Sequence, residues 1–429
     1  MDANAALSGA DRTGTPHLGA APTRAAPTRA AAPCGARRAG FDDWINRTFD
    51  TVVLQPTSLC NLDCAYCYLP ARKKRNELLP AVARAVAASI AQQTAQQTAG
   101  RTGEQTAESD RPVTVVWHGG EPTALPITRF ADRLAAFEDL RRAGRVRHSI
   151  QTNATLIDHR WCRLLRDHGF EVGVSIDGPA AASLNRVGWT GRPAFDQIMR
   201  GIGLLREHQI PFSVICVVSP QTIADPGGLM AFFDDLGCTR VGFNIEEREG
   251  VNTRTPVDAP AAQAFWQGVL NHHTARPRAR GGHRGARPRV REIDQLADYL
   301  TRARDGRKEE WTTAKHDPIP TIAWNGDTVL MSPELLGIHA PRHRDFVVGN
   351  VLKESLPTML RQAHQVGYIQ ELLGGLAACR AECAFFDFCR GAHAGNRYFE
   401  HGTFAATETA HCRNTRQALV TAFATTIKE

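Results

Sequence analysis

The stretch Cys60-Asn61-Leu62-Asp63-Cys64-Ala65-Tyr66-Cys67 carries three cysteines at C-x₃-C-x₂-C spacing. It follows the run Thr51-Val52-Val53-Leu54-Gln55, which is short, apolar and β-branched and therefore predicts a buried strand. We expect the three thiols on a loop at the carboxyl end of that strand. Thiolates are soft ligands, and three of them close together suit an iron–sulfur cluster. Because a cubane cluster has four irons, three protein ligands leave one iron open to another molecule.

A structural zinc site is the alternative for this triplet. Such a site takes four closed ligands, which usually come from two closely spaced pairs. The sequence offers no fourth thiol nearby, and His118 is the distant residue that would have to complete the set. The spacing therefore favours an iron–sulfur cluster over zinc or over an unliganded triplet.

The composition limits the class of protein. The chain has 429 residues and is 42% hydrophobic, which predicts one large domain and an appendage. No apolar run is long enough to span a membrane, and no signal-peptide core follows Met1, so we expect a cytoplasmic protein. Eleven cysteines in that setting indicate metal or redox use rather than disulfides. A net charge of +7 is too moderate to imply nucleic acid as a partner.

Strand-like and helix-like runs alternate after the first forty-odd residues. The strands are expected at Val52–Gln55, Val113–Trp117, His148–Thr152, Glu171–Ile176, Phe212–Val218 and Arg240–Ile245. The helices are expected at Leu79–Gln97, Ile127–Ala143, Asp158–His168, Ala194–His208, Leu229–Leu236 and Ala261–His272. Alternation of this kind predicts a parallel sheet, and six units are too few for an eight-stranded barrel. The predicted fold is α/β, an open partial (β/α)₆ TIM-like barrel over residues 46–274.

Polar and glycine-rich clusters follow the first four expected strands. After the cysteine loop come Trp117–Thr123, then Gln151-Thr152-Asn153, and then Ser175-Ile176-Asp177-Gly178-Pro179. The carboxyl ends of parallel strands share one face, where active sites are built. We therefore expect the four clusters around one mouth.

Two further segments have their own composition. Residues 1–45 are rich in Ala, Pro and Arg and are expected to be a disordered tail, in which Cys34 has no role. Residues 275–320 are expected to be a basic linker and a bridging helix with Leu296 on its apolar stripe. The linker lacks interleaved aromatics, so we expect a flexible connection that attracts an acidic peptide rather than nucleic acid.

The cysteine triplet, with Tyr66 just before its last member, resembles the signature of the radical SAM superfamily. In that family the open iron is chelated by the amino and carboxylate groups of S-adenosylmethionine. The run Gly119-Gly120-Glu121-Pro122 resembles the family's GGEP motif, whose backbone contacts the cofactor's amino group. The resemblance further implies cofactor contacts by Gln151, Thr152, Asn153, Ser175, Asp177 and Arg192. Tight turns, an Asx-stabilised turn and a solvated arginine are the structural alternatives for these residues.

The last part of the chain, residues 321–429, begins with a hairpin signal at Asn325-Gly326 and ends with a second cysteine group. The members of this group are Cys379, Cys383, Cys389 and Cys412. Four thiols close a metal site fully, and their spacing does not separate zinc from iron–sulfur. In a chain that also carries the triplet, an auxiliary [4Fe-4S] cluster is favoured.

This region resembles the SPASM-type auxiliary domain of peptide-modifying radical SAM enzymes. The most similar are maturases that form three-residue cyclophanes in ribosomal peptides, with matches at Ser332–Gly337, Phe346–Val351 and Asn396–Cys412. The run Arg390–His393 departs from the family's glycine-rich pattern, and Cys379 and Cys383 are one residue further apart than is common. Ser332-Pro333 stands where a Pro-Cys pair is expected, so we expect one auxiliary cluster and not two. The remaining cysteines, Cys162, Cys216 and Cys238, read as buried apolar residues.

The resemblance implies that a reduced cluster on the triplet cleaves S-adenosylmethionine to a 5′-deoxyadenosyl radical. That radical takes hydrogen from a side-chain Cβ of a precursor peptide, and the carbon radical joins an aromatic ring two residues away. The auxiliary cluster would accept the electron released on rearomatisation. The implied partners are the precursor peptide, with its leader and core, and a reducing donor such as flavodoxin or ferredoxin; no nucleic acid and no membrane are expected. The sequence identifies no general base.

Two other functions stay open at this point. An anaerobic sulfatase-maturing enzyme, which makes formylglycine in a protein substrate, shares the triplet and the SPASM-type tail. A non-catalytic metal-binding scaffold for protein partners would also use these cysteines. Production of 5′-deoxyadenosine separates both enzymes from the scaffold.

Overall fold

The computed structural model describes residues 40–99, 111–275 and 287–428. The expected tail up to residue 39, with Cys34, and residues 276–286 of the expected linker lie outside the described residues. Residues 41–45 were expected in the tail but are folded. Phe41–Trp44 form the short helix α1, and Phe41, Trp44 and Ile45 are buried. These apolar side chains interrupt the Ala/Pro/Arg composition, and Trp44 packs edge-on against Phe386.

The six expected strands are all present and confirm the predicted sheet. They are β1 (Thr51–Leu54), β2 (Val113–Trp117), β3 (Val146–Thr152), β4 (Glu171–Ser175), β5 (Phe212–Val218) and β6 (Arg240–Ile245). Each strand pairs in parallel with the next one along the chain. The predicted fold, a partial α/β barrel, is therefore confirmed, and the carboxyl ends of the six strands lie on one face.

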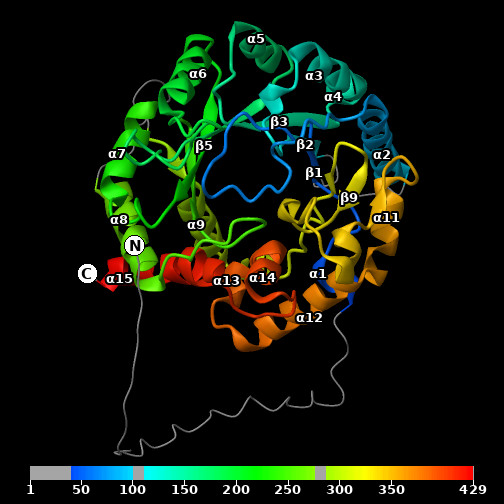
Figure 1. Ribbon diagram of the computed structural model, residues 1–429. Coiled ribbons are helices and arrows are strands. Elements are labelled where there is room, and N and C mark those ends of the chain that lie inside the picture. Colours follow the sequence, from blue (N-terminus) through cyan, green and yellow to red (C-terminus); the bar gives the residue numbers. More distant parts are fainter. Residues whose placement is uncertain (1–39, 100–110, 276–286, 429) are drawn as a thin grey trace, which may run out of the picture. The chain divides into compact units, whose positions relative to one another are not determined.

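A layer of helices covers the outer face of the curved sheet (Figure 1). It consists of α2 (Pro80–Ala99), α3 (Ile127–Leu134), α4 (Glu138–Arg142), α5 (His159–Asp167), α6 (Phe195–Glu207), α7 (Pro226–Leu236) and α8 (Ala259–Thr274). Asp158, Asp225 and Asp258 cap α5, α7 and α8 through backbone N–H groups of the first turn. The helix expected over 127–143 is broken by a 3₁₀ turn, η3 (Ala135–Phe137), where Phe137 enters the core edge-on to Trp117.

Short strands from the second half of the chain extend both edges of the sheet. β7 (Arg289–Val290) pairs with β6, and β8 (Thr321–Ile322) pairs in parallel with β1. β9 (Asp327–Val329) returns antiparallel to β8, and β10 (Gly349–Asn350) completes the ten strands of the sheet. The hairpin predicted at Asn325-Gly326 is confirmed, with Gly326 at a φ of +92°. Its continuity with the barrel was not predicted, because strands of two residues carry no periodicity.

Further helices come after α8 in the chain. They are α9 (Arg291–Arg304), α10 (Lys308–Thr312), α11 (Leu356–Gln362), α12 (Gly367–Glu382), α13 (Phe386–Cys389), α14 (Ala394–His401), the π-helix η7 (Cys412–Gln417) and α15 (Ala418–Lys428), with 3₁₀ turns η4 (Pro333–Leu335), η5 (Pro341–Phe346) and η6 (Ala363–Gln365). One more 3₁₀ turn, η2 (Pro122–Ala124), lies between β2 and α3. α15 packs along α8, and Trp266 donates a hydrogen bond from Nε1 to the Asn414 carbonyl at 2.8 Å. The last helix therefore returns to the barrel.

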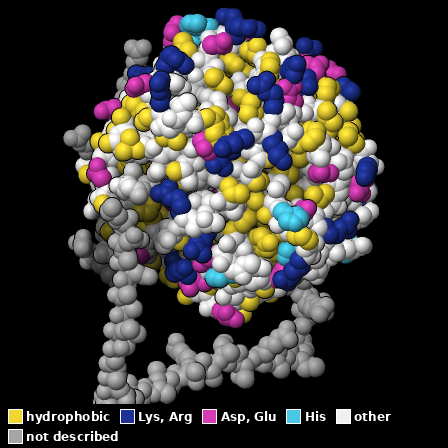
Figure 2. Space-filling model, viewed as in Figure 1, with side chains coloured by type: hydrophobic (Ala, Val, Ile, Leu, Met, Phe, Trp, Pro, Cys, Tyr) yellow, Lys and Arg dark blue, Asp and Glu magenta, His cyan; other side chains and the backbone are white. Residues whose placement is uncertain are grey.

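The surface bears charges of both signs. On the face shown in Figure 2, lysine and arginine side chains are interspersed with aspartate, glutamate and uncharged groups. Among the described residues, no helix has the length and apolar character needed to cross a membrane.

Candidate functional site

The segment between β1 and α2 carries the three cysteines and is held by backbone hydrogen bonds to other loops. The Cys60 N–H donates to the Arg72 carbonyl at 2.9 Å within the segment. The loop after β4 receives the N–H groups of Asp63 and Ala65 at 2.7 and 2.9 Å. The Trp189 indole donates to the Cys60 carbonyl at 3.0 Å. These bonds fix a loop that has no regular secondary structure of its own.

All three thiols of the triplet line one cavity of about 310 Å³. Burial is the main cause that raises the thiol pKa of each, to about 11 for Cys64. A tetrahedral zinc site, with Zn–S of about 2.3 Å, brings its sulfurs to about 3.8 Å from one another. Among the described residues, no three cysteines have sulfurs that all lie within 4.8 Å of one another. Three thiols on one cavity form a donor set that suits an iron–sulfur cluster, in which each sulfur binds a different iron.

The GGEP run lies directly beside the cysteine loop. Gly119 and Gly120 have φ values of +96° and +64°. A Cβ on Gly120 would lie 2.3 Å from the Thr57 carbonyl oxygen and 2.7 Å from that of Leu59. Only glycine allows this approach, so the loop after β2 lies flush against the backbone that leads into Cys60. Gly120 also lines the cavity, whereas Gly119 does not.

Glu121 joins the end of β2 to the end of β3. Its buried carboxylate accepts hydrogen bonds from the Thr152 hydroxyl at 2.6 Å and from the Asn153 N–H at 2.8 Å. It also accepts from the hydroxyl and the N–H of Thr123 at 2.6 and 3.0 Å, where Pro122 begins η2. Burial, which outweighs these bonds, raises the pKa of Glu121. Glu121, Thr152 and Asn153 all line the cavity.

The end of β3 also reaches the cysteine loop itself. The Asn153 amide donates to Asn61 Oδ1 at 2.9 Å and lies 3.9 Å from the Cys60 sulfur. Gln151 donates to the Ser175 hydroxyl at 2.8 Å, and both side chains line the cavity. The clusters that follow β1, β2, β3 and β4 therefore meet at one mouth, as the strand order predicts.

Four of the expected cofactor contacts do not line the cavity: Gly119, described above, and three residues that lie elsewhere. Asp177 is buried below the cavity wall, where it accepts hydrogen bonds from the Tyr66 hydroxyl, Arg186 Nη2 and the Val217 N–H. Arg192 is exposed and does not line the cavity, because it belongs to the turn that follows Trp189. Pro122 is buried within η2 and does not line it either.

Arg186 is a cavity residue that the sequence did not reveal. It is 5% exposed, forms an ion pair with Asp177 at 3.0 Å and lies 5.5 Å from the Tyr66 ring centre. Burial disfavours its charged form, but Asp177 and the neighbouring acidic groups outweigh burial and raise its pKa. A lone arginine in a loop has no sequence signal that separates it from a surface charge. It places a fixed positive charge beside the cysteine triplet.

His118 also lines the cavity, but not as a partner of the cysteines. Its Nε2 lies 2.8 Å from the Tyr68 hydroxyl, in a hydrogen bond that links the loop after β2 to the cysteine segment. Burial lowers the pKa of His118 to about 4, so the imidazole is neutral. No metal-binding geometry joins it to the triplet among the described residues.

The opposite wall of the cavity is acidic. It is formed by Glu246, Glu247 and Glu249, which follow β6, and by Glu334 in η4. Glu246 pairs with Arg254 at 3.2 Å, Glu247 lies 3.1 Å from His411 Nδ1, and Glu334 accepts from the Ser332 hydroxyl. Burial raises the pKa of all four carboxyls, that of Glu247 to about 8. The rule that located the first four clusters applies equally to the end of β6 and would have found three of these residues.

The second cysteine group also gathers in one place. Cys379 lies in α12, Cys383 at its end, Cys389 at the end of α13 and Cys412 at the start of η7, and all four line a second, separate cavity. The Cys389 thiol donates to the Cys412 sulfur, which lowers the pKa of Cys412 and raises that of Cys389. Four converging thiols form a donor set that suits a second cluster.

Arg397 supports this second cavity. It is 2% exposed and donates to the Cys379 sulfur at 3.1 Å and to the Gly391 carbonyl at 2.9 Å. Arg397 thereby holds the run Arg390–His393, which differs from the family's glycine-rich pattern, against α12. A Cβ on Gly391 would lie 2.3 Å from the Leu376 side chain. Cys162, Cys216 and Cys238 are buried as expected. The described residues thus leave no cysteine for a second auxiliary cluster.

A family profile described as the radical SAM superfamily matches residues 54–233. An uncharacterized protein of Synechocystis sp. is 30% identical over 380 residues, which cover 84% of this chain and 88% of that protein. A serine-type anaerobic sulfatase-maturating enzyme of Klebsiella aerogenes is 32% identical over 202 residues, which cover 46% of each chain.

Solved structures share the fold. The structure described as native anSMEcpe with bound AdoMet and Cp18Cys peptide has a TM-score of 0.64 at 19% identity, covering 88% of this chain and 98% of that one. Streptococcus suis SuiB bound to its precursor peptide SuiA has a TM-score of 0.59 at 18% identity, covering 85% and 76%. At these identities the likeness concerns the fold alone.

Proposed function

The chain belongs to the radical SAM superfamily, and from this we propose that it is a peptide maturase that forms a cyclophane crosslink in a ribosomally made precursor. S-adenosylmethionine and a [4Fe-4S] cluster are its cofactors, with an auxiliary cluster as in SPASM-type relatives. The crosslink joins an aromatic side chain to the Cβ of a residue two positions away.

One observation carries the proposal: the thiols of the triplet share a cavity with the ends of β2, β3 and β4. Cys60, Cys64 and Cys67 would hold the cluster. Gly120, Gln151 and Asn153 present backbone and amide groups beside it, where the polar parts of a nucleotide would bind. The volume of about 310 Å³ is at the lower end of the range for small-molecule sites.

When bound, the cluster and S-adenosylmethionine supply the radical that removes hydrogen from the substrate. The chain's own residues position and enclose the reactants. Glu121 and Asp177 have their carboxylates saturated by donors from several loops, so both act as fixed supports. Burial favours the neutral, protonated form of the carboxyls of Glu246, Glu247, Glu249 and Glu334, so the acidic wall can donate hydrogen bonds to a molecule bound in the cavity.

A peptide is the substrate class that best fits the space on the acidic side of the cavity. A neighbouring cavity of about 270 Å³ shares Glu247, Glu249 and Glu334 with the first and continues toward α14. A side chain that enters the first cavity would leave its flanking residues in the second. The fold shared with SuiB, whose structure holds a precursor peptide, supports this substrate class.

Crosslinking removes two hydrogens from the peptide, one by abstraction and one as a proton with an electron. Cys379, Cys383, Cys389 and Cys412 would hold the auxiliary cluster, which is a suitable acceptor for that electron. A flavodoxin or ferredoxin would supply the electron that starts each turnover.

The test is co-expression with a candidate precursor that carries an aromatic residue and a second residue two positions away. We expect a product lighter by two hydrogens, whose backbone fragments are missing between the joined residues in tandem mass spectrometry. The Cys60→Ala variant should leave the precursor unchanged. An unmodified precursor in the presence of 5′-deoxyadenosine production would reject the proposed reaction but keep the radical SAM assignment.

Formylglycine formation is the second candidate, and it is favoured by the Klebsiella aerogenes relative. Oxidation of a serine to formylglycine also removes two hydrogens, so the mass alone does not separate the two reactions. An aldehyde reacts with a hydrazide reagent, whereas a C–C crosslink does not. Labelling by the hydrazide, together with complete backbone fragmentation, would support this second candidate. A loaded cluster that yields no 5′-deoxyadenosine would support the non-catalytic scaffold.

A further inference from the structure

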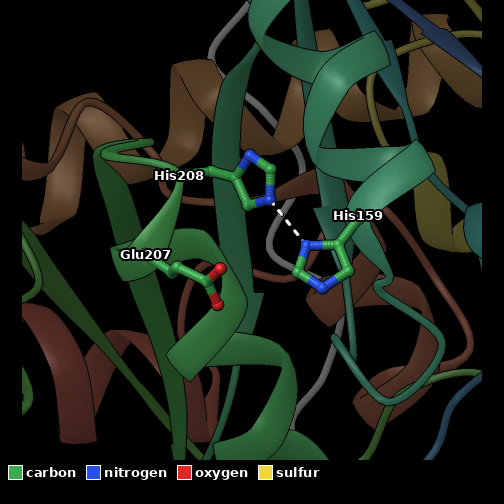
Figure 3. A group of neighbouring side chains, drawn as sticks. All are labelled: His159, Glu207 and His208. Carbon is green, nitrogen blue, oxygen red and sulfur yellow. Dashed lines mark hydrogen bonds between the residues drawn. The ribbon is translucent and has the colours of Figure 1, made fainter.

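Three potential metal ligands meet on the outer helical layer, apart from both cysteine cavities. His159 is the first residue of α5, Glu207 is the last residue of α6, and His208 follows it. Their ligand atoms all lie within 4.8 Å of one another, and no other set of three His, Cys, Asp or Glu residues in the described ranges does so. Figure 3 shows the two imidazoles facing each other, with the Glu207 carboxylate beside them.

The two imidazoles are already aligned on a common point. His159 Nδ1 lies 2.8 Å from His208 Nε2, and the rings are inclined at 53°. One nitrogen must donate a proton to the lone pair of the other, so both lone-pair directions converge between them. A metal ion that replaces this shared proton would be bound by both nitrogens, after each ring tilts from the line that joins them to reach a tetrahedral angle at the metal.

We propose that His159, His208 and Glu207 form a binding site for a divalent first-row transition ion of the Zn²⁺ class. Two imidazoles and a carboxylate are ligands that zinc and its neighbours accept. Zn–N bonds of about 2.0–2.1 Å place two nitrogens about 3.3 Å apart in a tetrahedral site, so the pair needs to open by about half an ångström. His159 and Glu207 are exposed, which leaves room for water at the remaining position.

The position of this site would let a bound metal ion stabilise the loop that supports the cysteine triplet. The loop between β3 and His159 contains Thr155, whose hydroxyl accepts a hydrogen bond from Asn61 at 2.7 Å in the cysteine loop. α6 holds the same loop: Arg200 donates to the Thr155 carbonyl at 2.9 Å, and a Cβ on Gly201 would lie 2.0 Å from the Ala154 carbonyl oxygen. An ion at the ends of α5 and α6 would fix both helices around the loop that supports the triplet.

The test uses full-length protein with both clusters loaded, so that the cysteines are occupied and their iron content is known. Zn²⁺ is added in equilibrium dialysis, and bound zinc is counted by elemental analysis. We expect one zinc per chain beyond the clusters, with nitrogen and oxygen neighbours and no sulfur by X-ray absorption. At a free concentration about 100 times the Kd, the melting temperature should rise by several degrees.

The variants H159A and H208A should lose the extra zinc, and E207Q should weaken its binding about tenfold. H339A is the matched control, because His339 is 82% exposed and belongs to a different region. It should bind zinc as the wild type does. Circular dichroism and iron content check that each variant is folded. Zinc that binds equally to the wild type and H159A, or binds through sulfur, would show an adventitious ion only and overturn the proposal. This inference does not depend on the proposed peptide chemistry.

Discussion

The carboxylate of Glu121 accepts a hydrogen bond of 2.6 Å from the hydroxyl of Thr152, across the carboxyl ends of β2 and β3. Glu121 of the GGEP run therefore holds the loops after β2 and β3 together, in addition to lining the cavity.

The substitution Glu121→Gln should destabilise the protein. The amide keeps one oxygen, so its NH₂ group would face either the Asn153 N–H or the donors from Thr123 and Thr152, and the donors on that side would lose their acceptor. We expect a loss of about 2 kcal/mol in the free energy of unfolding and weaker binding of S-adenosylmethionine. Denaturant unfolding and a binding titration measure both. Glu77→Gln is the control: its ion pair with the largely exposed Arg129 should cost no more than about 0.5 kcal/mol. Equal losses in the free energy of unfolding for the two variants would show that Glu121 does not hold these loops together.

Gly120→Ala should be far more damaging than Gly169→Ala. Both glycines have a φ of +64°, in the left-handed region, so each alanine carries backbone strain of about 1–2 kcal/mol. Only at position 120 does the new Cβ overlap backbone atoms, those of Thr57 and Leu59, whereas the space around Gly169 is open. The difference in melting temperature between the two variants isolates this contact. Similar melting temperatures would refute the close packing of the GGEP run against the cysteine loop.

Arg186→Met should cost about 3–5 kcal/mol, because it leaves the buried carboxylate of Asp177 without its cation. Adding Asp177→Asn should recover part of that loss. A double-mutant cycle by denaturant unfolding measures the coupling. If the double variant lost the sum of the two single losses, the two residues would not act as a pair.

Loss of a cysteine from the triplet and loss of a cysteine from the second group should affect the reaction differently. Cys60→Ala should abolish formation of 5′-deoxyadenosine, because the open iron site depends on the triplet. Cys389→Ala should keep measurable 5′-deoxyadenosine formation but lower the yield of modified peptide at least tenfold. Chromatography of both products from one reaction gives the ratio. A Cys389 variant with a normal peptide yield would remove the auxiliary site from the proposed electron path.

His148 should make the stability depend on pH. Burial lowers its pKa from 6.5 to about 3, so between these values the unfolded chain binds more protons than the folded one. The contribution of His148 is fully present above pH 6.5 and is lost as the pH falls toward 3. His148→Phe should flatten the dependence between pH 7 and 5, at a cost of about 1 kcal/mol for the Trp117 N–H it leaves unpaired. Urea unfolding at both pH values, with H339A as control, measures the slope. An unchanged slope would contradict the buried neutral imidazole.

The strands and the shared mouth were predictable because period-2 patterns and polar strand ends are local features. β5 alternates between buried and half-buried residues along its whole length, as its sequence indicates. The acidic wall after β6 was accessible to the same reasoning, but its Glu-Glu-Arg-Glu run resembles an ordinary charged turn. That this run lines a cavity is seen only in the structure, where Glu334, distant in sequence, joins it in the same wall.

For the remaining predicted site residues, tertiary contacts determine whether the side chain reaches the cavity. Asp177 lies two residues beyond Ser175, the last residue of β4, yet Tyr66 and Arg186 cover it, so a position at the end of a strand did not determine whether a side chain reached the cavity. Arg192 and Arg186 lie six residues apart in one loop, and only their packing distinguishes the exposed one from the buried one. A sequence pattern contains no record of such packing.

The pairing of β8 with β1 has a consequence for how the chain is made. The N–H groups of Val53 and Gln55 donate to the carbonyls of Pro320 and Ile322, on the side of β1 away from β2. Until the ribosome has synthesised residue 322, the strand that leads into the triplet remains an open sheet edge, a known template for aggregation. A truncated barrel that ends before this point would expose the same edge, so production of the isolated barrel should favour misassembly over a working minimal enzyme.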